Sequence, residues 1–231
     1  MDFVKFPKTP HLFVMPGLDI RGDKIMTTEE SKEFLDGEIL IEEKVDGANI
    51  GFSFNENQIL RIQNRGKFIT SNAHPQFELI QDWLSYRLDL FSKYLGSRYI
   101  LFGEWCYAKH TVQYKSLPDW FLGFDVFDRE EEAFLSSKFR NSFFENLNIS
   151  PIPELDKGIF TKEQLASLLK NGNSEIGGDS LEGLYLRKEG SSKLLKRAKL
   201  VRSDFIQNIT LHWRMRRLER NTLAPTSPAF P

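Results

Sequence analysis

Three short strand-like runs separated by tight turns are the feature that most constrains how this chain can fold. They cover residues 38–43, 49–54 and 58–64. In the middle run Ile50, Phe52 and Phe54 alternate with small or polar residues, the period-two pattern of a strand with one buried face. Asp46-Gly47 and residues 55–57 separate the runs and are typical turn sequences. The pattern predicts an antiparallel meander.

A single lysine, Lys44, lies where the first run meets the Asp46-Gly47 turn. A lysine that attacks phosphorus must be held in place, partly desolvated, and near other cations that lower its pKa. A strand followed by a lysine and a tight turn can provide this, so Lys44 is a candidate nucleophile. The same residues also fit an ordinary surface hairpin with a solvated lysine, and by themselves they do not decide between the two.

Helices and further strands are expected after the first three runs. The apolar residues of 75–95 recur at helical spacing, and Phe139, Phe143 and Leu147 predict an inward face for a helix over 136–147. Shorter helices are expected from Thr28 to Gly37 and over 161–170, where Thr161 and Gln164 form a capping box. The remaining strands are expected over residues 99–105, 120–128, 183–189 and 193–201.

Several charges lie where a purely structural strand would not need them. Glu104 ends an apolar run and Glu182 precedes one, and a buried acid requires a metal ion or a basic partner. Arg197 and Lys199 are two residues apart, so in a strand both point to one face, where they could hold a phosphate and lower the pKa of Lys44. Each feature alone also fits solvated strand ends. Together they indicate a phosphate-and-metal site.

Composition narrows the setting. The chain has 231 residues and a formal net charge of −1, yet in residues 193–220 basic residues outnumber acidic ones nine to two. Such a basic end is expected if it meets phosphates, although a solvated arginine-rich helix would look the same. Cys106 is the only cysteine, and no long apolar run suggests a signal peptide or a membrane span. A soluble cytoplasmic protein is expected.

A series of short motifs carries a resemblance to a known family. The motifs are Glu43-Lys44-Val45-Asp46-Gly47-Ala48-Asn49, Asn64-Arg65-Gly66-Lys67, Phe102-Gly103-Glu104-Trp105, Phe124-Asp125-Val126-Phe127-Asp128, Leu181-Glu182-Gly183-Leu184 and Lys196-Arg197-Ala198-Lys199. Their order and spacing over residues 38–202 resemble the covalent nucleotidyltransferase superfamily of ligases and capping enzymes. Within it the chain looks most like the ATP-dependent RNA ligases, particularly the nick-sealing RNA ligase 2 type.

The resemblance implies the catalytic roles. Lys44 would attack the α-phosphorus of ATP, expel pyrophosphate and carry AMP through a phosphoramidate bond. Lys199, with Arg197, would neutralise the α-phosphate as charge builds in the transition state. Magnesium, with Mn²⁺ able to substitute, would be held by Glu104 and Glu182.

It also implies the binding residues. Glu43 and Asn49 would help to hold the nucleoside and the RNA end around the lysine. Arg65 would contact the ribose or the phosphates, Glu104 would bind the ribose, and Phe124 would stack on adenine. The AMP would then move to an RNA 5′-phosphate, and a 3′-hydroxyl would displace it. RNA with these two kinds of end, nicked or single-stranded, is the expected partner.

The implied fold is an α+β nucleotidyltransferase (ATP-grasp-like ligase) domain of two antiparallel sheets with flanking helices and the ATP pocket between them. It would occupy residues 1–202, followed by a basic helix over 203–221 and a disordered tail over 222–231. This leaves no room for the OB-fold of DNA ligases and capping enzymes. Either the basic helix stands in for a C-terminal domain or a protein partner supplies one.

Two positions depart from the pattern and keep alternatives open. The best-matched ligases often have histidine where Asp46 stands, whereas DNA ligases and capping enzymes usually have aspartate. In the last motif either Lys196 or Arg197 could be the first functional cation. The alternatives are an ATP-dependent DNA ligase, a capping-type guanylyltransferase and, in a different class, a non-catalytic nucleic-acid-binding relative.

Overall fold

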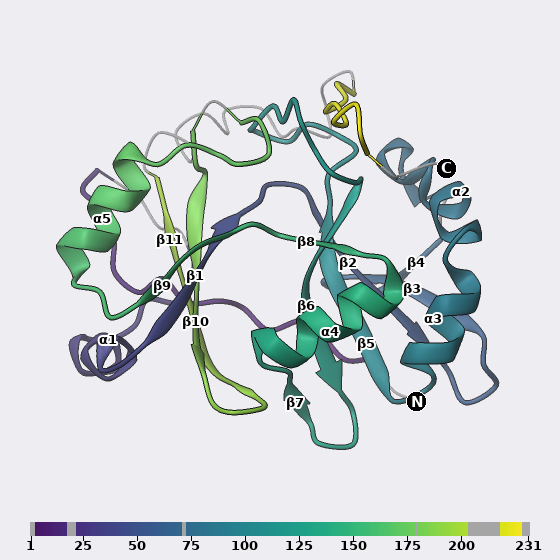
Figure 1. Cartoon of the computed structure of the whole chain (residues 1–231), viewed down its shortest axis with the longest axis horizontal. Coiled ribbons are helices and arrows are strands. Elements are labelled where there is room, and N and C mark those ends of the chain that lie inside the picture. Colours follow the sequence, from purple (N-terminus) through teal and green to yellow (C-terminus); the bar gives the residue numbers. More distant parts are fainter. Residues whose placement is uncertain (1–2, 18–21, 71–72, 179, 203–217, 228–231) are drawn as a thin grey trace.

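A computed structural model describes residues 3–17, 22–70, 73–178, 180–202 and 218–227. Its smaller sheet has four antiparallel strands in the order β11-β10-β1-β9. Their bounds are β1 Ile39–Lys44, β9 Glu154–Gly158, β10 Gly183–Glu189 and β11 Leu194–Val201. The helices α1 (Thr28–Leu35) and α5 (Lys162–Asn171) flank this sheet on the left of Figure 1.

The larger sheet follows the order β4-β3-β2-β5-β6-β7, with β8 added beside β6 in parallel. Its strands are β2 Ala48–Phe54, β3 Leu60–Asn64, β4 Phe68–Ile69, β5 Tyr99–Trp105, β6 Phe121–Asp128, β7 Ala133–Phe134 and β8 Ser150–Pro151. The expected arrangement of two antiparallel sheets with flanking helices is confirmed.

Each sheet has its own hydrophobic core. The 3-10 helix η2 (Pro75–Phe77), α2 (Ile80–Ser85), α3 (Leu88–Leu95) and α4 (Ser137–Leu147) accompany the larger sheet, whose core includes stacked Phe52 and Trp83. The smaller core gathers Phe34, Leu165 and Leu184 from α1, α5 and β10. No helix in the described part of the chain is long and apolar enough to cross a membrane.

The predicted meander is wrong at its first turn. Strands β2 and β3 do form a hairpin, with Phe52 opposite Ile62, but β1 pairs with β9 and β10 and belongs to the other sheet. The Asp46-Gly47 link therefore crosses from one sheet to the other. Gly47 is needed there because a Cβ would lie 2.6 Å from the Trp105 carbonyl oxygen.

Two helix predictions also need correction. The helix expected over 75–95 is broken into η2, α2 and α3, and between α2 and α3 Arg87 turns inward to pair with buried Asp119 at 2.7 Å. In α4 the side chain of Phe139 is 46% exposed, while Arg140 and Phe144 point inward. Here a buried arginine takes the place that the apolar spacing assigned to Phe139.

Residues 222–227 differ from the expected disordered tail, whereas 228–231 lie outside the described residues. Leu223 forms a bridge with Leu117, and the backbone N–H of Ala224 donates to the Leu117 carbonyl at 2.8 Å. Asn221, only 4% exposed, anchors this segment to the larger sheet's core. Residues 222–227 are thus held in place, because apolar and buried amide side chains find partners there. Most of the predicted basic helix lies outside the described residues, and 218–220 are not helical.

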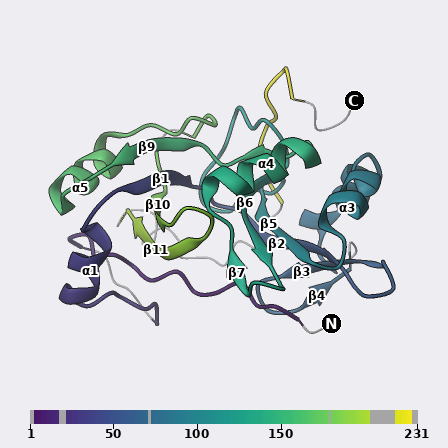
Figure 2. The same ribbon diagram turned by 60° about the horizontal axis from the view of Figure 1, so that its bottom comes forward.

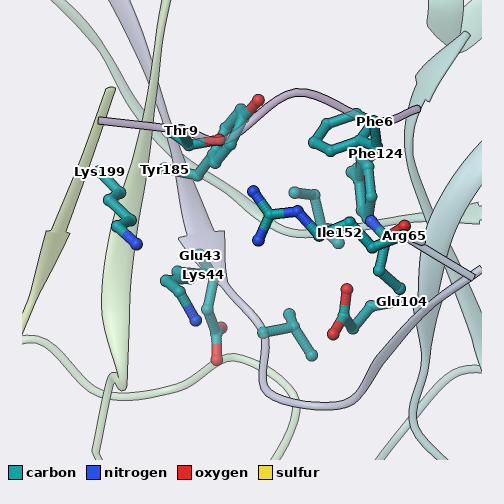
Figure 3. Close-up of a pocket in the computed structure, with 12 residues that line it drawn as sticks. Phe6, Thr9, Glu43, Lys44, Arg65, Glu104, Phe124, Ile152, Tyr185 and Lys199 are labelled. Atoms are coloured by element: carbon teal, nitrogen blue, oxygen red, sulfur yellow. The ribbon is translucent and has the colours of Figure 1, made fainter. Parts of the chain in front are cut away.

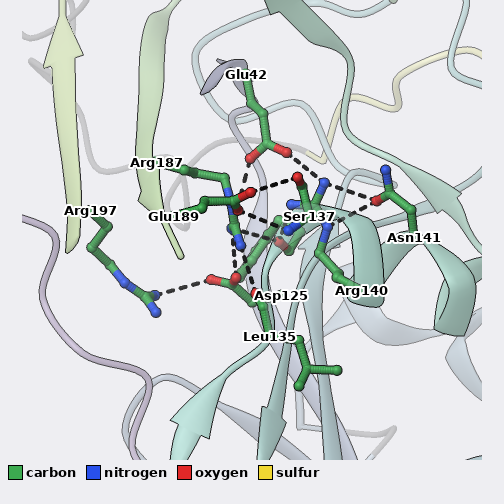
Figure 4. A network of polar contacts seen from close by, with 10 residues as sticks. Glu42, Asp125, Leu135, Ser137, Arg140, Asn141, Arg187, Glu189 and Arg197 are labelled. Carbon is green, nitrogen blue, oxygen red and sulfur yellow. Dashed lines mark hydrogen bonds and ion pairs between the residues drawn. The ribbon is translucent and has the colours of Figure 1, made fainter. Parts of the chain in front are cut away.

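A network of buried charges joins the two sheets (Figure 4). Arg187 of β10 pairs with Asp125 of β6 at 2.6 Å, and Arg140 of α4 pairs with Glu42 of β1 at 2.7 Å. All four side chains are 1% exposed or less. The network fixes how the two sheets face each other, and it therefore also fixes the pocket between them.

The segment before α1 also connects the sheets, crossing beneath both in Figure 2. Gln63 of β3 donates to the Val4 carbonyl at 2.8 Å, and farther along the N–H of Lys199 in β11 donates to the Pro10 carbonyl at 2.9 Å. Residues between these contacts can therefore reach the space between the sheets.

Candidate active site

A cavity of about 190 Å³ lies between the two sheets (Figure 3). Seven residues proposed from the sequence line it, and they come from both sheets and the β3–β4 turn: Glu43, Lys44, Asn49, Arg65, Glu104, Phe124 and Lys199. Glu182 lies against it through its ion pair with Lys44.

Lys44 is the last residue of β1 and is directly opposite Gly183 of β10. Because Glu182 precedes that glycine, its carboxylate comes within 2.5 Å of the lysine Nζ. A Cβ on Gly183 would lie 3.1 Å from Lys44 Cδ and 2.4 Å from the Leu200 carbonyl oxygen. The glycine therefore makes room for the aliphatic stem of the lysine.

The pKa of Lys44 is shifted in the direction opposite to the one expected from the sequence. Burial by itself would lower the pKa of this lysine, but the carboxylates of Glu182, Asp46 and Glu104 outweigh burial and raise it. The prediction that neighbouring cations lower this pKa is wrong for the protein without ligands. The sequence placed Arg197 and Lys199 near the amine but did not show how closely the acids surround it.

Those acids have unusual pKa values of their own. Burial raises the pKa of Glu104 to about 8 and that of Glu182 to about 7, although Lys44 opposes both shifts. Glu104 Oε1 accepts from the Gly47 N–H at 3.1 Å, while Glu182 Oε2 is buried with no hydrogen-bond partner. Two buried carboxyls that resist ionisation and an unpartnered oxygen suit an added cation.

A divalent metal ion fits this arrangement. Carboxylate oxygens are the ligands that Mg²⁺ and Mn²⁺ prefer, and Glu104 and Glu182 supply them. Among the described residues, no group of three or more His, Cys, Asp or Glu forms a ready metal cage. This suits Mg²⁺ in nucleotide enzymes, which takes one or two carboxylates and completes its shell with phosphates and water.

The larger sheet supplies the aromatic side of the pocket. The rings of Phe124 and Phe6 meet edge to face with centroids 5.1 Å apart. Arg65 extends from the β3–β4 turn, where its Nη2 donates to the Pro7 carbonyl at 3.2 Å (Figure 3). This side of the pocket has an aromatic ring and a cation, a combination that can hold a nucleobase and its attached phosphates.

Glu43 and Asn49 face the same space with different surroundings. The Glu43 carboxylate is 1% exposed and accepts from Ser174 Oγ at 2.6 Å and from the Glu175 N–H at 3.0 Å. Burial raises its pKa despite these bonds. Asn49 is paired with Glu104 across β2 and β5, and its Oδ1 is buried without a partner.

Lys199 lines the pocket from β11 and is already paired. Asp23 lies 2.6 Å from its Nζ and 3.3 Å from Nε2 of His11, which is 1% exposed. Burial would raise the pKa of Asp23, but Lys199 and His11 lower it. The N-terminal segment thus places a carboxylate on the cation that β11 brings to the pocket.

Arg197 shares a strand face with Lys199, as expected, but it is not among the residues that line the pocket. Its guanidinium pairs with Asp125 at 3.1 Å and lies 4.0 Å from the centre of the Phe134 ring. The buried carboxylate of Asp125 draws it into the network between the sheets. Lys196 pairs with Glu33 of α1 at 2.7 Å.

Five pocket residues were given no role by the sequence reasoning: Phe6, Thr9, Val45, Ile152 and Tyr185. Tyr185 could have been found, since it follows Gly183 by two residues in a strand and so shares its face. Its hydroxyl is buried without a partner, and burial raises its pKa to about 12. Phe6, Thr9 and Ile152 come from segments whose path no local pattern reveals.

Comparison with known proteins identifies the family and the fold. The family model described as RNA ligase matches residues 37–201. No curated protein matches the chain. Solved structures of Naegleria gruberi RNA ligase are similar. A mutant with AMP and Mn has a TM-score of 0.61 and 16% identity, covering 89% of this chain and 57% of that one. The form with PPi gives 0.58 and 15%, covering 90% and 64%.

Proposed function

The chain belongs to the RNA ligase family, and from this we propose that it is an ATP-dependent ligase that joins an RNA 3′-hydroxyl to an RNA 5′-phosphate. The observation that carries the proposal is Lys44, fixed at the end of β1 in a pocket with Glu104, Phe124 and Lys199. The chain spans 53% to 64% of the length of the solved Naegleria gruberi ligases that it resembles. The activity of a whole ligase is therefore proposed for this chain.

Three transfers make up the proposed reaction. The Nζ of Lys44 attacks the α-phosphorus of ATP, so a P–N bond forms and pyrophosphate leaves. An oxygen of the RNA 5′-phosphate then attacks the same phosphorus, which releases the lysine and leaves AMP joined to the RNA. Finally the 3′-hydroxyl oxygen attacks the RNA 5′-phosphorus, the new phosphodiester forms, and AMP leaves.

The roles proposed for the pocket follow from its two sides. Phe124 stacks on the base, while Glu104 and Arg65 hold the ribose and phosphates, and Lys199 neutralises the α-phosphate. For Lys199 to act, Asp23 must give way to the nucleotide, because both bind the same Nζ. Arg197 contributes by fixing Asp125 and β11 and does not touch phosphate.

The amine of Lys44 must lose its proton before it attacks. In the protein without ligands the surrounding carboxylates oppose this, since they raise its pKa. A divalent cation at Glu104 and Glu182 supplies positive charge that favours the neutral amine and the negatively charged phosphates. The Naegleria gruberi structures with ATP and Mn support this choice of nucleotide and metal.

A joining assay tests the proposal. The protein is incubated with Mg²⁺, ATP and an RNA nick carrying 5′-phosphate and 3′-hydroxyl ends, and the product length is measured. Parallel reactions replace ATP with GTP, or the RNA strands with DNA. We expect joining with ATP and RNA. Joining of DNA alone would identify a DNA ligase, and nucleotide transfer from GTP alone would identify a capping-type enzyme.

A further inference from the structure

A second cavity of about 680 Å³ adjoins the pocket around Lys44. The two share Asn49 and Arg65, so these two side chains border both cavities. We call the second cavity the side groove. It is lined by residues of the β2 start, the β3–β4 turn, the η2 region and one loop, among them Asn64, Lys67, His74, Gln76 and His110.

The charge of the side groove is one-sided. Arg65 and Lys67 are exposed at its edge, and His74 and His110 add two imidazoles. None of the described lining residues is acidic, although the whole chain has a formal net charge of −1. Two carboxylates adjoin lining residues: Asp46 Oδ1 lies 4.0 Å from His110 Nδ1, and Glu104 Oε1 accepts from the Gly47 N–H at 3.1 Å. Such a surface attracts a polyanion.

The walls of the side groove are held by their own hydrogen bonds. Asn64 Oδ1 accepts from the N–H groups of Gly66 and Lys67, both at 2.9 Å, which fixes the turn that carries the two cations. On the other wall His110 Nε2 lies 3.0 Å from Gln76 Oε1. The Gln76 carbonyl accepts from Trp105 Nε1 at 2.6 Å. This wall is therefore tied to the residue next to Glu104.

We propose that the side groove binds the sugar–phosphate backbone of the RNA strand that carries the 5′-phosphate, an inference that rests on the proposed ligase function. The terminal phosphate lies at Asn49 and Arg65, and the following phosphates lie along Lys67 and His74. The two shared residues offer amide and guanidinium donors, which suit a terminal phosphate better than a hydroxyl. The 5′-phosphate must also reach the AMP on Lys44, which lines the same pocket as Asn49 and Arg65.

The test compares Lys67→Ser with Lys170→Ser. Both remove one exposed lysine charge, but Lys170 lies on α5, beside the other sheet. Lysyl-AMP formation is measured by intact mass, and the affinity for a short 5′-phosphorylated RNA is measured by fluorescence anisotropy over a range of salt concentrations. The same RNA with a 5′-hydroxyl serves as the second ligand.

We expect Lys67→Ser to form lysyl-AMP as the native protein does and to bind RNA about fivefold more weakly at low salt, with the slope of log affinity against log salt smaller by ~0.7. The preference for a 5′-phosphate should persist, because Asn49 and Arg65 are intact. Lys170→Ser should match the native protein. Unchanged RNA affinity and salt slope in Lys67→Ser would overturn the proposal, as would an equal loss of lysyl-AMP formation. Native protein that forms no lysyl-AMP would instead refute the ligase function.

Discussion

Removing Arg187 tests whether the buried network holds the two sheets together. Its side chain is fully buried and lies 2.6 Å from Asp125 and 2.7 Å from Glu189. Arg187→Met keeps the apolar stem but leaves buried carboxylates short of a cation. Breaking such a pair costs about 3–5 kcal/mol of unfolding free energy. For a chain of this size that corresponds to a fall in Tm of roughly 6–20 °C.

The assay is urea denaturation followed by tryptophan fluorescence, together with thermal unfolding. The matched control is Arg98→Met, because Arg98 also pairs with an aspartate, Asp128, at 2.6 Å but has a side chain that is 38% exposed. Asp128 keeps hydrogen bonds from the backbone, so we expect a loss of about 1 kcal/mol or less. Arg187→Lys, which keeps the charge but loses the planar fork, should fall between the two. Equal small losses of unfolding free energy in Arg187→Met and Arg98→Met would show that the buried network does not hold the sheets together.

Three further outcomes follow from the pocket. Asp23→Asn should tighten ATP binding by up to about fivefold, because the phosphate no longer competes for Lys199, and an unchanged KM for ATP would contradict this. Phe124→Ala should weaken nucleotide binding by about 1–3 kcal/mol in a titration with ATP, whereas an unaltered Kd would show that this ring does not stack on the base. Glu104→Gln should stabilise the metal-free protein at pH 9 but not at pH 5. Because the pKa of Glu104 is raised from 4.5 to about 8, the folded state binds this proton more tightly than the unfolded state does. The free energy of unfolding therefore falls as the pH rises from 4.5 through 8. The effect is on the order of 4 kcal/mol, and parallel Tm curves for the two proteins would exclude it.

Local patterns were enough to identify most strands and seven of the residues that line the pocket. Alternation located β5 and β10, and the capping box at Thr161 located α5. Residues that lie next to turns and strand ends are constrained by the backbone around them, which is why Lys44 and Glu104 could be recognised. What these patterns describe is the environment within a few residues of each position.

Local sequence patterns do not describe how distant segments pair. Nothing near Asp46-Gly47 indicates that β1 joins β10 instead of β2, because its partner strand lies far away in the sequence. The raised pKa of Lys44 depends on Glu182, far away in the chain, and the position of Arg197 depends on Asp125. Buried ion pairs between remote residues override local expectations, so they became visible only in the folded structure.

The most direct test of the central claim is the intact mass of the protein after incubation with Mg²⁺ and ATP. The native protein and Lys44→Arg are compared, since arginine keeps the positive charge beside Glu182 but cannot act as a nucleophile. Both should first be shown to be folded and free of bound AMP. We expect the addition of one AMP to the native protein and none to Lys44→Arg. An adduct of the same mass on Lys44→Arg, or none on the native protein, would contradict it.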